Sequence, residues 1–155
     1  MKRITSLSLV LICILSVTAS AGLGSKKTAY IGGTITSIKE GTEGVSSTTD
    51  EKAWTFDYKN GKLSIPYDKV TELEYGQKAG RRVAMAILIS PIALFSKKRK
   101  HYLTITYMND DGKQQAGVFE LGKDIVRTML ASVEARTGKQ IQYQDDEARK
   151  HAKGD

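Results

Sequence analysis

Cysteine is almost absent from this chain of 155 residues. The single cysteine, Cys13, lies in an apolar stretch near the N-terminus, at 4–17. The rest of the chain can therefore form no disulfide and no cysteine-based metal site, and it offers no thiolate nucleophile. A domain without such links must be held together by its hydrophobic core, which is feasible above about 80 residues.

Histidine is almost as scarce, with only His101 and His151. Neither has a second ligand at a metal-binding spacing such as His-x-x-x-His, so the sequence predicts no bound metal. A Gly-x-Ser-x-Gly nucleophile elbow is missing. Residues 117–124 resemble a phosphate-binding loop, but Asp124 replaces the hydroxyl residue that would hold magnesium. The sequence therefore predicts no cofactor and no enzymatic activity.

Apolar runs long enough to cross a membrane are also missing, because a transmembrane helix needs about 20 such residues. The N-terminus instead has the three parts of a secretory signal peptide: cations at 2–3, the apolar stretch at 4–17 and small residues at 19–21. We expect cleavage after Ala21 and a periplasmic or secreted protein. Lipidation is not expected, because Cys13 lies inside the apolar stretch rather than at the cleavage point.

Positive charge exceeds negative charge, which gives a formal net charge of +7. Loss of Lys2 and Arg3 with the signal peptide leaves +5. In an exported protein this excess favours an anionic lipid, an anionic polymer or an acidic partner protein. Nucleic acid is not an expected partner, because export separates the chain from it.

Alternating apolar residues, typical of strands, fill most of the remaining sequence. The predicted strands are 29–38, 45–49, 53–58, 63–67, 70–75, 101–108 and 115–121. Asn60-Gly61 indicates a tight hairpin. Gly32-Gly33 indicates a bulge or a close approach of the backbone.

Two sets of side chains on these strands have both a structural and a functional interpretation. Trp54, Phe56 and Tyr58 alternate on one strand face, as core residues or as a ligand-stacking face. Glu72 and Glu74 share the outer face of their strand, where solvated carboxylates are expected rather than a catalytic pair.

A helical period replaces the strand pattern near the C-terminus. The helical apolar stripe consists of Ile125, Val126, Met129, Leu130 and Val133. Asp124 lies in the expected first turn and Gly138 follows as a C-terminal cap. A short extended piece is expected at 141–143. The charged residues that follow have almost nothing to bury, so they are predicted to be disordered or loosely helical.

Strands first and one helix last is the order of a pleckstrin-homology-like (PH-like) domain. Residues 63–76, with the step Ile65-Pro66, resemble a strand pair of GRAM and bacterial PH-like domains, and 102–137 resemble their final hairpin and closing helix. The resemblance implies a mainly β fold: an antiparallel barrel or strongly bent sheet closed by one C-terminal amphipathic helix. It also implies binding of phosphoinositides, peptides or protein surfaces rather than catalysis. The basic pattern of the phosphoinositide site is missing from 37–50. The chain also resembles small secreted bacterial proteins without an assigned activity.

One further segment, residues 81–100, combines apolar and basic residues. Residues 83–95 are apolar apart from Ser90. As a helix they would span about 20 Å, short of the hydrocarbon core of about 30 Å. They are either core, a partner or self-association face, or a loop that dips into a membrane while the flanking cations hold anionic headgroups. The predicted contact residues are Arg81, Arg82, Ile87, Leu88, Ile92, Leu94, Phe95, Lys97, Lys98, Arg99 and Lys100.

These patterns divide the chain into four parts. They are a signal peptide at 1–21, a flexible leader at 22–28, a single PH-like domain at 29–143 and a charged disordered tail at 144–155. We expect an exported, non-catalytic interaction module at the bacterial cell envelope, whose partner is a protein, including a second copy of the chain. The alternative is a peripheral binder of anionic membrane surfaces that uses 83–95 and its flanking cations.

Overall fold

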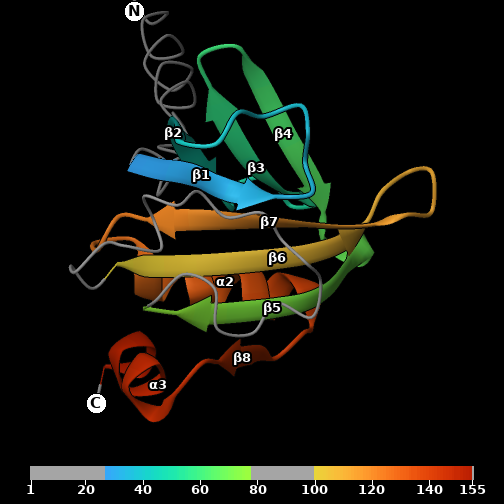
Figure 1. The fold of residues 1–155 in the computed structure, drawn as a ribbon. Coiled ribbons are helices and arrows are strands. Elements are labelled where there is room, and N and C mark those ends of the chain that lie inside the picture. The colour runs from blue at the N-terminus through green and yellow to red at the C-terminus, as the bar shows by residue number, and fades with distance from the viewer. Residues whose placement is uncertain (1–26, 78–99, 155) are drawn as a thin grey trace, which may run out of the picture.

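One eight-stranded sheet forms the centre of the protein (Figure 1). The structure, a computed structural model, describes residues 27–77 and 100–154. The strands are β1 (Lys27–Gly33), β2 (Thr42–Ser47), β3 (Ala53–Tyr58), β4 (Gly61–Pro66), β5 (Val70–Gly76), β6 (His101–Met108), β7 (Gln114–Leu121) and β8 (Ile141–Tyr143). The helices are the short 3-10 helix η1 (Tyr67–Lys69), α2 (Val126–Thr137) and α3 (Asp146–Lys153). The predicted mainly β fold with a helix near the C-terminus is confirmed.

The sheet is open, with β4 at one edge and β8 at the other. The strand order is β4-β3-β2-β1-β7-β6-β5-β8, and neighbours are antiparallel except for β5 and β8, which are parallel. In Figure 1, β3 and β4 run steeply across the direction of β5, β6 and β7. A closed barrel, one of the two predicted forms, is wrong for the described residues. The chain turns from β4 into β5 through η1, and β8 occupies the side of β5 that closure would need.

The main core lies between one face of the sheet, the inner face, and α2. Trp54 and Phe56 on β3 are at most 1% exposed, and the centroid of the Trp54 ring lies 4.6 Å from that of Phe119 on β7. The predicted stripe of α2 is buried throughout: Ile125, Val126, Met129, Leu130 and Val133. The core interpretation of Trp54 and Phe56 is therefore confirmed, and a ligand-stacking face is excluded because both rings are covered.

Both ends of α2 show how its sequence sets its length. Gly138 adopts a left-handed conformation with φ of 66°, and its amide donates a hydrogen bond to the Glu134 carbonyl. This is the predicted C-terminal cap. At the other end the helix begins at Val126, so Asp124 precedes the first turn instead of lying in it.

Two glycines shape β1, as the sequence predicted. The register between β1 and β7 shifts between Tyr30 and Gly32. A Cβ atom at Gly33 would collide with the backbone carbonyl of Ala116, and the φ of 145° at Gly33 is rarely adopted by L side chains. The close backbone approach is confirmed, but β1 ends at Gly33 instead of continuing to residue 38.

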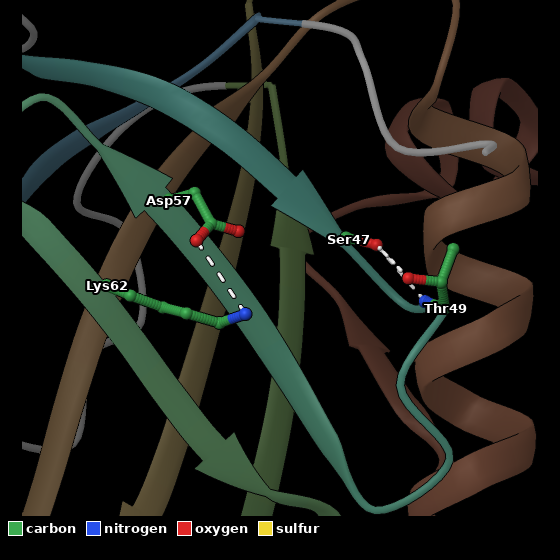
Figure 2. Close-up of polar contacts among 4 residues, drawn as sticks. All are labelled: Ser47, Thr49, Asp57 and Lys62. Atoms are coloured by element: carbon green, nitrogen blue, oxygen red, sulfur yellow. Dashed lines mark hydrogen bonds and ion pairs between the residues drawn. The ribbon is translucent and has the colours of Figure 1, made fainter.

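The β3–β4 hairpin is present, with a different loop from the one predicted. Tyr58 pairs with Gly61, so residues 59–60 form the two-residue turn and Gly61 begins β4. Figure 2 shows Lys62 on β4 reaching towards Asp57 on β3, with Nζ 3.7 Å from Oδ1. Both side chains are about half exposed, so this pair contributes at most about 1 kcal/mol.

Local features end the neighbouring strands. After β2, the Ser47 hydroxyl accepts a hydrogen bond from the Thr49 amide at 3.1 Å and lies 2.8 Å from the Thr49 hydroxyl (Figure 2). These contacts turn the chain towards β3. Pro66 is the last residue of edge strand β4 and has no amide hydrogen, which an edge strand tolerates.

The charged tail, predicted to be disordered or loosely helical, forms the helix α3, so the disordered alternative is wrong. The Asp145 side chain accepts a hydrogen bond from the Ala148 amide at 2.8 Å and caps the helix. Ala148 is fully buried in the main core, and Gly154 ends the helix in a left-handed conformation. Composition left both alternatives open, and the cap and the small buried side chain favour the helix. Of the helices in the described ranges, none has the length and apolar character needed to span a membrane.

Candidate functional site

Lys100 is the one predicted contact residue that the structure describes; residues 81–99 lie outside the described ranges, as does the signal peptide. Lys100 immediately precedes β6, and its Nζ lies 2.9 Å from Oε2 of Glu120 on β7. The two side chains are 35% and 26% exposed. Lys100 therefore already has an anionic partner within the domain, which weakens its predicted role as a headgroup contact.

A second, smaller apolar cluster lies on the other face of the sheet, the outer face. The cluster contains Ile31 on β1 (7% exposed), Tyr102 on β6 (3%) and Val118 on β7 (1%). Ala29 packs against these three residues. Side chains alternate along a strand, so these residues point away from the main core. The buried residues of α2 and α3 all belong to the main core. Burial, with a smaller contribution from Glu120, raises the pKa of Tyr102 to about 12.

Polar side chains on the same face are buried too. Thr104 and Thr106 on β6 are 8% and 7% exposed, and Glu74 on β5 is 6% exposed. Oε1 of Glu74 accepts a hydrogen bond from Nε2 of Gln144 at 3.2 Å. The prediction of a solvated surface is therefore wrong for Glu74, because β8 brings Gln144 alongside it; Glu72 is half-buried.

The two histidines meet at one end of the sheet. His101, the first residue of β6, is 7% exposed, and its Nδ1 lies 2.7 Å from the hydroxyl of Tyr75 on β5. Its ring centroid is 4.9 Å from that of His151 on α3. Burial, and to a smaller extent His151 and Lys123, lower the pKa of His101 below its ordinary value of 6.5. Neither histidine had a neighbour in the sequence that indicated this cluster.

Neither a family model nor a curated protein matches this chain. Functional conclusions therefore depend on the chemistry of the described residues.

The histidine cluster has little means of nucleophilic catalysis. The hydroxyl beside His101 belongs to Tyr75, whose pKa is raised to about 12 by burial. A protonated, buried phenol is a poor nucleophile at neutral pH. Within residues 27–77 and 100–154, no group of three or more histidine, cysteine, aspartate or glutamate side chains is arranged to hold a metal ion. Most of the phosphate-loop-like sequence belongs to β7, and β7 ends at Leu121.

Proposed function

We propose that this protein is an exported, non-catalytic interaction module of PH-like architecture, acting at the bacterial cell envelope. Seven antiparallel strands followed by α2 on the inner face support the PH-like assignment, although the open sheet departs from a closed barrel. PH-like domains bind phosphoinositides, peptides or protein surfaces and are rarely catalytic. The signal-peptide pattern supports export.

The buried outer face is the observation that carries this proposal. Ile31, Tyr102 and Val118 are almost inaccessible there, yet both described helices pack into the main core. A cluster of this kind needs an apolar cover. Residues 83–95 are the longest apolar stretch of the chain after the expected cleavage at Ala21.

The lengths involved are compatible with a contact between residues 83–95 and the outer face. Residues 78–99 join β5 to β6, which are antiparallel neighbours. A hairpin loop usually needs only about two to five residues. Residues 83–95 span about 20 Å as a helix and about 40 Å when extended. β1, β7 and β6 together are about 10 Å wide. We therefore assign 83–95 to a protein contact, on the outer face of its own chain or of a second copy.

Peripheral membrane binding is the second candidate, and the net positive charge favours it. Each cation near an anionic surface contributes about 1 kcal/mol. Arg81, Arg82 and the cations at 97–100 would supply most of this attraction. The ion pair between Lys100 and Glu120 removes part of that contribution.

Sedimentation with vesicles separates the two candidates. We expect the chain starting at Gly22 to remain in the supernatant with phosphatidylglycerol vesicles, as with phosphatidylcholine vesicles, at low and at physiological salt. The test variant, which is the first variant, replaces Lys97, Lys98, Arg99 and Lys100 by Gln. A charge-matched control replaces Lys52, Lys59, Lys62 and Lys69, all exposed, by Gln. Pelleting of the wild type with anionic vesicles, lost in the first variant and kept in the control, would overturn the protein-contact proposal.

A further inference from the structure

The contact between His101 and His151 joins the C-terminal helix to the sheet. His151 lies on α3, and its ring meets the His101 ring at an interplanar angle of 56°. α3 has other attachments as well: Ala148 is buried in the core, Ala152 packs against it, and Nε of Arg127 on α2 donates to the His151 carbonyl at 3.4 Å. The helix follows β8, which pairs with β5 through only three residues. The histidine contact is therefore one of the contacts that hold α3 in place.

The hydrogen bond to Tyr75 fixes the protonation state that suits this contact. Burial, with a smaller contribution from Tyr143, keeps the Tyr75 hydroxyl protonated, with a pKa of about 12. The hydroxyl therefore donates to Nδ1 of His101, which accepts only while the imidazole is neutral. Protonation of His101 would put a second hydrogen on this short contact and leave the Tyr75 hydroxyl without its acceptor.

The charged groups facing His101 come from several elements. Lys123, in the connection from β7 to α2, and His151 on α3 disfavour the imidazolium, whereas Glu120 on β7 favours it. Arg127 on α2 adds a further cation beside His151. Burial and the cations outweigh the single carboxylate, so the docked arrangement favours neutral His101.

We propose that His101 and His151 form an acid-sensitive latch, which holds α3 against the sheet at neutral pH and releases it in mildly acidic conditions. This goes beyond the proposed interaction function and does not depend on it. In the docked arrangement burial, and to a smaller extent His151 and Lys123, hold the pKa of His101 below its ordinary value of 6.5, and release of α3 would remove the contribution of His151. The stabilisation of α3 is therefore complete above about pH 6.5 and is lost as the pH falls through the lower pKa of the docked state.

Hydrogen exchange of the α3 amides in the full chain from Gly22 tests the latch. After correction for intrinsic exchange rates, protection of residues 146–153 should fall by up to about tenfold per pH unit below about pH 6.5. Protection of the α2 amides should stay unchanged. Equal α3 protection at about pH 7.5 and about pH 5 in the wild type would overturn the proposal.

Two variants identify the titrating group. His101→Phe keeps a ring in place and should make α3 protection independent of pH, so a persisting acid loss would contradict the latch. His151→Phe keeps the ring contact but removes one repulsive partner, so it should reduce the acid loss. The α2 amides report whether each variant folds. If His101→Phe does not fold, the test depends on His151→Phe. The proposal would then be overturned if α3 protection in His151→Phe falls in acid as much as it does in the wild type.

Discussion

Nε1 of Trp54 on β3 lies 3.3 Å from Sδ of Met129 on α2 and donates a hydrogen bond to it. The contact joins the part of the sheet near one edge to the helix that covers the inner face. The buried indole thereby has a polar partner, which a fully buried tryptophan requires. It also places the first half of α2 against the aromatic core.

Loss of a neighbouring side chain on α2 should destabilise the protein strongly. Leu130 is 3% exposed, so Leu130→Ala should lower the free energy of unfolding by about 2–5 kcal/mol, because it removes buried contacts and leaves a cavity. Thr128→Ser, at an exposed position of the same helix, should change it by less than about 0.5 kcal/mol. Chemical denaturation measures both. An effect of Leu130→Ala no larger than that of the control would show that this helix face is not core.

Gly33 should tolerate substitution less well than another glycine with positive φ. Gly33→Ala combines an unfavourable φ with a collision against the Ala116 carbonyl. Gly112 also has positive φ, of 73°, but a Cβ atom there would meet nothing within 4 Å. Gly112→Ala should therefore cost about 1–2 kcal/mol of unfolding free energy, and Gly33→Ala clearly more. Equal losses in thermal or chemical denaturation would mean that the close approach of β1 and β7 relaxes freely.

Local patterns in the sequence predicted most of the sheet and the main helix. The strand at 53–58 and the strand at 101–108 have the predicted bounds, and the α2 stripe is buried as expected. Alternation and helical spacing are local properties, so they can be read from neighbouring residues. β8 was expected only as a short extended piece, and its parallel pairing with β5 depends on residues far apart in the chain. That pairing also explains why the barrel, one of the two predicted forms, is wrong.

The candidate sites were harder to predict, because each depends on long-range contacts. Fifty positions separate His101 from His151, and their meeting depends on the folding of the charged tail into α3. The outer cluster joins three strands through Ile31, Tyr102 and Val118. The local signal for this cluster is an apolar residue on the second face of a strand, as at Tyr102 on β6 and Val118 on β7.

The cap of α3 gives a direct test of the corrected tail. Asp145→Ala removes the hydrogen bond to the Ala148 amide and should destabilise the helix by about 1 kcal/mol. Arg149→Ala removes an exposed ion pair with Asp146 and leaves both acidic residues of the first turn in place, and its effect should be at most about 0.5 kcal/mol. Exchange protection of the α3 amides at neutral pH measures the difference. Identical protection in the two variants would argue against the cap.

Export should leave a protein that begins at Gly22 and contains no covalent lipid. The expected cleavage follows from the small residues at 19–21 after the apolar stretch. The intact mass of the protein recovered outside the cytosol tests this. A species that begins at Cys13 and contains added acyl mass would contradict it and would make the protein membrane-anchored.

The free energy of unfolding of the double variant Leu94→Asp, Phe95→Ser tests the central claim most directly. If 83–95 covers an outer face, two polar groups placed there should cost more than about 2 kcal/mol or prevent folding. The loss would depend on protein concentration if the covered face belongs to a second copy. A second variant replaces Lys97, Lys98, Arg99 and Lys100 by Gln. Its free energy of unfolding should be almost the same as that of the wild type. Unchanged stability of the double variant, together with loss of binding to anionic vesicles, would contradict the account and favour a membrane-binding segment.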